Sequence, residues 1–409
     1  MSTDPMAESA QQLIADASAP QQAVPDVKRA RLGVSLIFAA HGAVYGSFAT
    51  RIPWLQDHRH IGPGLLGVAL LAPSVGALLG MPFASRLIHR YGGRRATRAM
   101  IVSWCICGAL PMLAPDVPVL FLLLMLYGLT SGMADVAMNA QAIPVEHAAG
   151  KSIMSGLHGM WSVGGLVASG AGALAAHVNL DARIQLAIVA AVLVVIALIG
   201  SAFLPENVAS ADEEAPPHFV RPPRAVVIIG LIAFCALFAE ASTSDWCAVY
   251  LKKVLGTSAG TAATAYTAFA FTMAASRLSG DFAVRRFGPK KTVRIAGIIG
   301  TAGGFLVVFA NNPGVAIGGF ALIGLGVAAV FPLAFAAAGH ADAQPARAIA
   351  GVATIAYGAG IAAPGIVGGI AAASSLHVSF AIITALVAML AIGAGVLQPK
   401  RPATEATVG

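Results

Sequence analysis

An acidic residue stands in the middle of a long apolar stretch, where a membrane would leave it without water. Asp135 lies within residues 117–141, and Asn139 follows four positions later. Positions i and i+4 share one face of a helix, so both side chains are expected to face the protein interior. A carboxyl group held away from bulk water can bind and release a proton near neutral pH. We predict proton coupling by Asp135 and solute binding by Asn139, although a carboxyl that only hydrogen-bonds a neighbouring helix would also fit.

A second polar group lies in the apolar stretch 225–251. Glu240, Asp245 and Trp246 are accompanied there by three hydroxyl residues, 242–244. Carboxylates accept hydrogen bonds from hydroxyl or ammonium groups, and an indole face covers a sugar ring or a cation. The three residues are therefore predicted to bind solute. Two alternatives fit as well: one acid could pair with Arg51 or a lysine at the outer boundary, and Trp246 could be an interfacial anchor.

Two histidines lie inside apolar stretches with a polar partner four positions on. His41 precedes Tyr45, and His158 precedes Ser162. Each pair would share a helical face, so His41, Tyr45 and His158 are further candidates for solute binding. A neutral histidine that hydrogen-bonds between helices is an equally good interpretation.

The elements that must position these residues are set by composition. Of the 409 residues, 57% are hydrophobic and only 11% are charged, against roughly a quarter charged in soluble domains. Crossing a bilayer takes about 20 mostly apolar residues. The pattern predicts twelve spans, at 32–53, 65–88, 98–114, 117–141, 154–177, 182–204, 225–251, 260–284, 292–311, 313–339, 347–371 and 376–397.

The charge distribution predicts orientation and domains. The net charge of +7 comes from short basic clusters between spans, with about 19 Lys and Arg on one side and about five on the other. The positive-inside rule puts both termini in the cytoplasm of an inner (plasma) membrane. We predict a disordered cytoplasmic tail (1–30), two six-helix bundles (31–204 and 225–398), a cytoplasmic linker (205–224) and a cytoplasmic tail (399–409).

An internal repeat supports the two halves. Residues 86–95, RLIHRYGGRR, recur as residues 282–291, FAVRRFGPKK, after the second span of each half. These segments resemble the loop motif of the major facilitator superfamily, in which charge contacts lock one gate. The usual acidic position holds His89 in the first copy and Arg285 in the second, so a substitute pair of Arg277 and Asp281 is expected. The predicted gating residues are Arg90, Gly92, Arg94, Arg95, Arg277, Asp281, Arg286 and Gly288.

Three further segments carry a closer likeness: GMADVAMNAQ (132–141), GLHGMWSVGG (156–165) and EASTSDWCAVY (240–250). They resemble the branch of that superfamily that holds the rhizopine-transport protein MosC and YbjJ-type inner-membrane proteins, with fucose permease as a more distant relative. In fucose permease a Glu matches Asp135 and is implicated in proton coupling, and an Asn matches Asn139. The resemblance implies an all-α membrane protein with the major facilitator fold, twelve transmembrane helices in two pseudo-symmetric bundles.

The expected function is proton-coupled transport of a small polar solute, such as a sugar, inositol derivative or amino sugar, by alternating access. A proton-driven exporter is the alternative, because the exporter motif of the superfamily is missing from residues 155–176 but has a partial echo, APGIVGG, at 363–369. A solute sensor or a lipid-handling scaffold is less well supported, because the predicted tails are too short for a signalling domain. We expect no enzyme activity, cofactor, metal or nucleic acid partner, and a monomer in the lipid bilayer.

Overall fold

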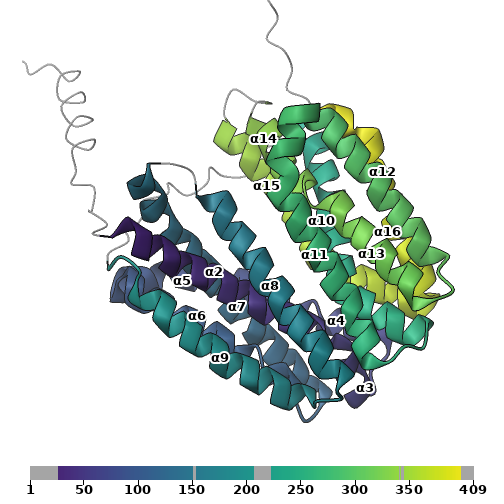
Figure 1. The fold of residues 1–409 in the computed structure, drawn as a ribbon, viewed down its shortest axis with the longest axis horizontal. Helices are drawn as coiled ribbons and strands as arrows, with labels where there is room; N and C mark the ends of the chain where they lie inside the picture. Colours follow the sequence, from purple (N-terminus) through teal and green to yellow (C-terminus); the bar gives the residue numbers. More distant parts are fainter. Residues whose placement is uncertain (1–25, 151–152, 207–222, 340, 342–344, 398–409) are drawn as a thin grey trace, which may run out of the picture.

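A computed structural model describes residues 26–150, 153–206, 223–339, 341 and 345–397, and every element in these ranges is helical (Figure 1). The side chains of Ser155, Asp281 and a few residues near 345 are outside this description. Residues 1–25 of the predicted N-terminal tail, the predicted C-terminal tail and the centre of the predicted linker also fall outside the described residues. The last residues of the tail predicted over 1–30 belong to the first helix instead, which begins at Val27. The other domain boundaries stay predictions.

The described helices make twelve crossings, six in each half. The first half comprises α2 (Val27–Ala49), α3 (Ile52–His58), α4 (Pro63–Ala69), α5 (Ala72–Tyr91), α6 (Gly93–Cys107), η1 (Leu110–Leu113), α7 (Val117–Ala149), α8 (Met154–His177) and α9 (Ala182–Ala202). The second half comprises α10 (Arg224–Val254), α11 (Ala259–Phe287), α12 (Pro289–Val308), α13 (Pro313–Val327), α14 (Val330–Gly339), α15 (Pro345–Ala373), α16 (Leu376–Gly393) and η2 (Ala394–Leu397). Four crossings are made by pairs: α4 with α5, α6 with η1, α13 with α14, and α16 with η2.

Length and composition agree with membrane crossing. Among the described residues, 11 helical spans are long and apolar enough to cross a bilayer. The remaining crossing is α11, which carries four threonines in its first half and therefore has a lower mean hydropathy. Large apolar side chains face outward, as on α9, where Val192 and Val195 are more than half exposed. Lipid rather than water suits such a surface, and the predicted twelve-helix, all-α membrane fold is confirmed.

Proline explains two breaks that hydropathy did not reveal. The predicted span 65–88 is divided at Leu70 and Leu71, because Pro73 in the first turn of α5 has no N–H to continue the helix from α4. The predicted span 313–339 is divided at Ala328 and Ala329. Pro332 follows directly, and because it has no N–H it cannot donate to the Ala328 carbonyl. Both breaks leave short helices, α4 and α14.

The two halves meet at one end and diverge at the other (Figure 1). We call the end where α2 begins and α9 ends the linker end, and the opposite one the far end. At the far end the halves touch backbone to backbone: a Cβ atom added to Gly67 would lie 2.8 Å from Cα of Gly368, and one added to Gly260 would lie 2.6 Å from Cα of His177. Glycine is required where helices approach this closely. The far end is therefore closed.

Candidate functional site

A cavity of about 230 Å³ lies between the two halves. Helices α2 and α8 line it from the first half, and α10 and α11 line it from the second. Its lining residues are Tyr45, Trp161, Ser162, Gly165, Leu237, Glu240, Ala241, Ser244, Tyr266, Phe269, Ala270, Met273 and Arg277. A small volume with a few convergent polar groups among apolar ones is typical of a small-molecule site.

An ion pair forms the charged part of the cavity wall. The Arg277 guanidinium donates from Nη2 to Glu240 Oε1 at 2.8 Å, and its Nη1 lies 3.5 Å from the Ser162 hydroxyl of the other half. The two charged side chains are 27% and 21% exposed, so each can still reach a solute in the cavity. Glu240 is thus placed where a solute could bind, as its predicted function requires. Arg277, predicted as a gating residue, lies beside it.

Aromatic rings form another part of the wall. Tyr45 lies between Trp161 and Tyr266, with ring centroids 6.0 and 6.4 Å away, and Phe269 continues the series 6.4 Å beyond Tyr266. The series crosses from α2 and α8 to α11, so it joins the two halves. Aromatic faces of this kind cover apolar ring surfaces while their polar tips remain available for hydrogen bonds.

His41 holds the aromatic wall from behind. Trp161 Nε1 donates to His41 Nδ1 at 2.9 Å, and His41 Nε2 lies 3.4 Å from the Ser131 carbonyl. Because Nδ1 accepts, the hydrogen-bond network assigns the ring proton to Nε2. The His41 ring also stacks on Trp104, with centroids 5.1 Å apart. His41 is buried, so it positions Trp161 rather than lining the cavity.

Asp135 lies toward the linker end from the cavity, not within its lining. Asn139 Nδ2 donates to the Asp135 carbonyl at 2.9 Å and lies 3.4 Å from its Oδ1, so the two share one face of α7. Electrostatic interactions connect Asp135 to His41, His158 and Tyr357. Because Tyr357 belongs to α15 of the other half, Asp135 lies within electrostatic range of both halves.

The other residues predicted around Glu240 lie off the cavity. Trp246 is fully buried, which places it neither in the lining nor at the membrane surface. Asp245 lies next to Tyr45 but is not among the residues that line the cavity. Arg51, the alternative partner predicted for one of the two acids, donates instead to Gln185 and to the Leu180 carbonyl. Sequence reasoning did not single out Trp161 as a site residue, although it stands between His158 and Gly165 on one helical face.

The two loop-motif copies adopt the same backbone turn. Gly92 and Gly288 have φ of 83° and 77° and separate α5 from α6 and α11 from α12. Such left-handed values favour glycine. Arg90 and Arg286 correspond as well, since each guanidinium lies over the ring of the next residue in the chain. The predicted internal repeat is therefore visible as repeated geometry.

Within the first copy, Arg94 binds the end of its own half. Its Nε donates to the Leu204 carbonyl at 2.6 Å, and its Nη1 lies 3.3 Å from Glu206 Oε1. Arg95 is exposed. The predicted Arg277–Asp281 pair is not tested, because the Asp281 side chain lies outside the described ones; Arg277 itself pairs with Glu240. Gating by these residues stays a prediction.

The described residues contain no group of three or more His, Cys, Asp or Glu side chains that could hold a metal ion.

The sequence matches the family model described as Major Facilitator Superfamily over residues 34–285 and 229–409. It is 34% identical to the uncharacterized transporter y4wD of Sinorhizobium fredii over 90% of this chain and 97% of that one. It is 33% identical to an uncharacterized MFS-type transporter of Yersinia pestis, over 91% and 97% of the two chains.

More distant likenesses agree. The membrane protein MosC of Rhizobium meliloti is 27% identical over 77% of this chain and 76% of its own length. A mutant of the nucleoside transporter NupG superposes with a TM-score of 0.73 at 14% identity, covering 90% of this chain and 99% of that one. A bacterial homologue of the lysosomal transporter Spinster, solved in an inward-facing and unoccupied conformation, gives 0.68 at 15% identity, covering 93% and 97%. The chain belongs to the Major Facilitator Superfamily and is a multi-pass membrane transporter of that family, not an enzyme.

Proposed function

We propose that this transporter is a proton-coupled symporter for a small polar solute such as a sugar, an inositol derivative or an amino sugar. It works in the inner membrane, with both termini and the linker end in the cytoplasm. The observation that carries the proposal is the cavity between the halves, where the Glu240–Arg277 pair faces an aromatic wall containing Tyr45 and Trp161. The far end, which carries five basic residues in the predicted topology, is then the outer side.

The lining matches a polyhydroxylated ring. Glu240 can accept hydrogen bonds from hydroxyl groups, and Arg277 can donate to hydroxyl or ring oxygens. Trp161 and Tyr45 offer flat apolar faces for the C–H surface of such a ring. The cavity of about 230 Å³ suits a solute of monosaccharide size better than a large drug molecule. This favours solute uptake over export of bulky compounds.

The proton would be carried by Asp135. This carboxyl lies within electrostatic range of both halves, and His158, on which it acts electrostatically, also interacts with Arg277 of the cavity wall. His158 precedes Ser162 by one helical turn, and Ser162 contacts Arg277. A change of charge at Asp135 therefore reaches the solute site through a few side chains. Such proximity is what coupling of proton and solute requires.

Transport into proteoliposomes tests the proposal. The purified protein is reconstituted, a pH gradient of either sign is imposed, and uptake of radiolabelled monosaccharides, inositols and amino sugars is measured. We expect one of these classes to accumulate when the outer side is acidic. Accumulation only when the gradient has the opposite sign would identify an exporter instead. Equal uptake rates with and without the gradient would rule out proton coupling.

A further inference from the structure

The short helix α3 lies across the far end, between the two halves. It follows the first crossing directly, and it contacts α10 of the second half. Because it belongs to neither a crossing nor a simple turn, its attachments on each side determine how it moves when the halves rock.

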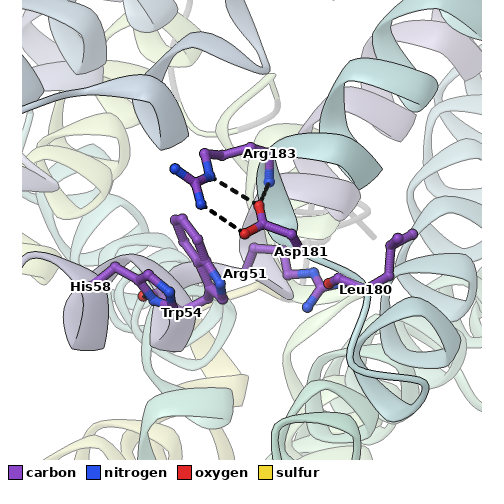
Figure 2. A network of polar contacts seen from close by, with 6 residues as sticks. All are labelled: Arg51, Trp54, His58, Leu180, Asp181 and Arg183. Carbon is purple, nitrogen blue, oxygen red and sulfur yellow. Dashed lines mark hydrogen bonds and ion pairs between the residues drawn. The ribbon is translucent and has the colours of Figure 1, made fainter.

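The first half holds α3 by several contacts (Figure 2). Arg51, at the start of α3, donates to Gln185 of α9 and from Nη2 to the Leu180 carbonyl at 3.1 Å. The Arg183 guanidinium lies 5.6 Å from the centroid of the Trp54 ring. Arg183 is itself held by Asp181 at 2.9 Å. These contacts join the start and the middle of α3 to the turn between α8 and α9 and to the first turn of α9, so α3 is attached to the first half at more than one point.

The second half holds α3 through a single carboxylate. Asp57, in the last turn of α3, pairs with Lys252 and with Lys253 near the end of α10. Among the described residues these are the ion pairs that join the two halves; the remaining pairs each lie within one half. All three side chains are between 24% and 44% exposed, so water can replace each contact when it breaks.

We propose that α3 is an electrostatic latch of the far end: Asp57 is clasped by Lys252 and Lys253 while the far end is closed, and it is released when that end opens. The latch goes beyond the proposed function, because it requires neither the solute nor the proton that the transporter carries. In this proposal, Asp57, Lys252 and Lys253 control how often the far end changes from closed to open.

The charge environment agrees with a latch that stays charged. Burial raises the pKa of the Asp57 carboxyl, but the hydrogen bonds and charges of Lys252 and Lys253 outweigh this, and the pKa lies below its usual value of 3.8. His58 and Arg59 follow on the same chain segment, and Asp181 and Arg183 face α3 from the α8–α9 turn. The hydrogen bond from Arg183 lowers the pKa of Asp181 to about 2, so that acid is charged as well.

The test is a distance measurement across the far end of the full-length protein in nanodiscs. Val178, at the end of α8, and Asn311, between α12 and α13, are exposed residues at the far end of the first and the second half. Spin labels on Val178→Cys and Asn311→Cys report the separation of the halves by pulsed electron resonance, without any solute. We expect Asp57→Asn, and separately the double variant K252Q/K253Q, to raise the ratio of open to closed far ends about three- to tenfold. Asp181→Asn is the matched control, because it removes an acid at the same end whose partner, Arg183, belongs to its own half.

A second measurement distinguishes loss of the ion pairs from misfolding caused by the substitutions. In the protein without substitutions at Asp57, Lys252 or Lys253, raising the salt concentration screens such half-exposed pairs and should shift the ratio in the same direction. The charge-reversed triple variant D57K/K252D/K253D should restore the closed distances. Unchanged distances in Asp57→Asn, or a shift as large in Asp181→Asn, would overturn the latch while leaving the proposed transport function intact.

Discussion

Arg277 of α11 donates to Glu240 of α10 at 2.8 Å, and both side chains face the cavity between the halves. This contact combines two residues that the sequence assigned to different tasks, solute binding for Glu240 and gating for Arg277. An arginine within the eighth crossing is explained by its carboxylate partner, since a charge in a membrane interior needs one. The same pair leaves both groups able to exchange their contact for one with a solute.

Removing one member of this pair should harm the protein more than removing both. We expect Glu240→Gln or Arg277→Gln to lower the free energy of unfolding by about 1–3 kcal/mol, less than for a fully buried pair because a quarter of each side chain is exposed. The double variant E240Q/R277Q should recover most of that stability and still fail to transport. Thermal unfolding in detergent measures the first effect and proteoliposome uptake the second. Equal stability of all three variants would contradict a coupled pair.

Asp135→Asn should abolish uptake driven by a pH gradient and spare solute exchange. An amide cannot take up a proton, but it keeps the size of the side chain and can still accept from Asn139. Both activities are measured in the same proteoliposomes, first with a pH gradient and then with unlabelled solute inside. Undiminished pH-driven uptake in this variant would remove Asp135 from the coupling mechanism.

Gly368→Val should open the far end, whereas Gly369→Val should not. A Cβ atom at position 368 would lie 2.6 Å from Cα of Gly67 in the other half, and one at position 369 meets nothing within 4 Å. The closed state therefore has no room for the first side chain and ample room for the second. Accessibility of a far-end cysteine to a membrane-impermeant maleimide gives the measurement. Similar labelling rates for the two variants would contradict the close approach of α4 and α15.

The far end should stay closed over the range from about pH 5 to 8. Because Asp57 has a lowered pKa in the closed state, its contribution is complete above the ordinary value of 3.8 and is lost only as the pH falls through the lowered one. Spin-label distances recorded against pH check this. A transition between pH 5 and 8 that disappears in Asp57→Asn would contradict the lowered pKa of Asp57.

The membrane made much of the fold predictable. Hydrocarbon tolerates no unpaired backbone polar groups, so long apolar stretches must be helices, and their number and the repeat around Gly92 and Gly288 could be counted from the sequence. Hydropathy did not reveal the breaks before Pro73 and Pro332, because alanine and leucine on both sides keep the pattern apolar. The short helix α3 was likewise hidden in a segment that looked like a loop.

The site was less predictable, because it depends on contacts between distant residues. Periodicity placed Asp135 and Asn139 on one face, and the structure agrees. It could not show that Glu240 would meet Arg277, 37 positions away, or that Asp57 would meet Lys252, 195 positions away. Trp161 needed His41, 120 positions away, to fix its ring. Such partners are set by helix packing, which a single sequence does not encode locally.

The neutrality of the cavity wall determines where voltage can act. Glu240 and Arg277 cancel, so they transfer no net charge when the halves rock. Among the described ion pairs none includes Asp135. Under the proposed coupling, the carrier with Asp135 protonated and an uncharged solute bound reorients without moving net charge. The empty carrier, with Asp135 deprotonated, returns with one negative charge. A membrane potential negative inside would then drive that return step, by up to about 2.3 kcal/mol per 100 mV.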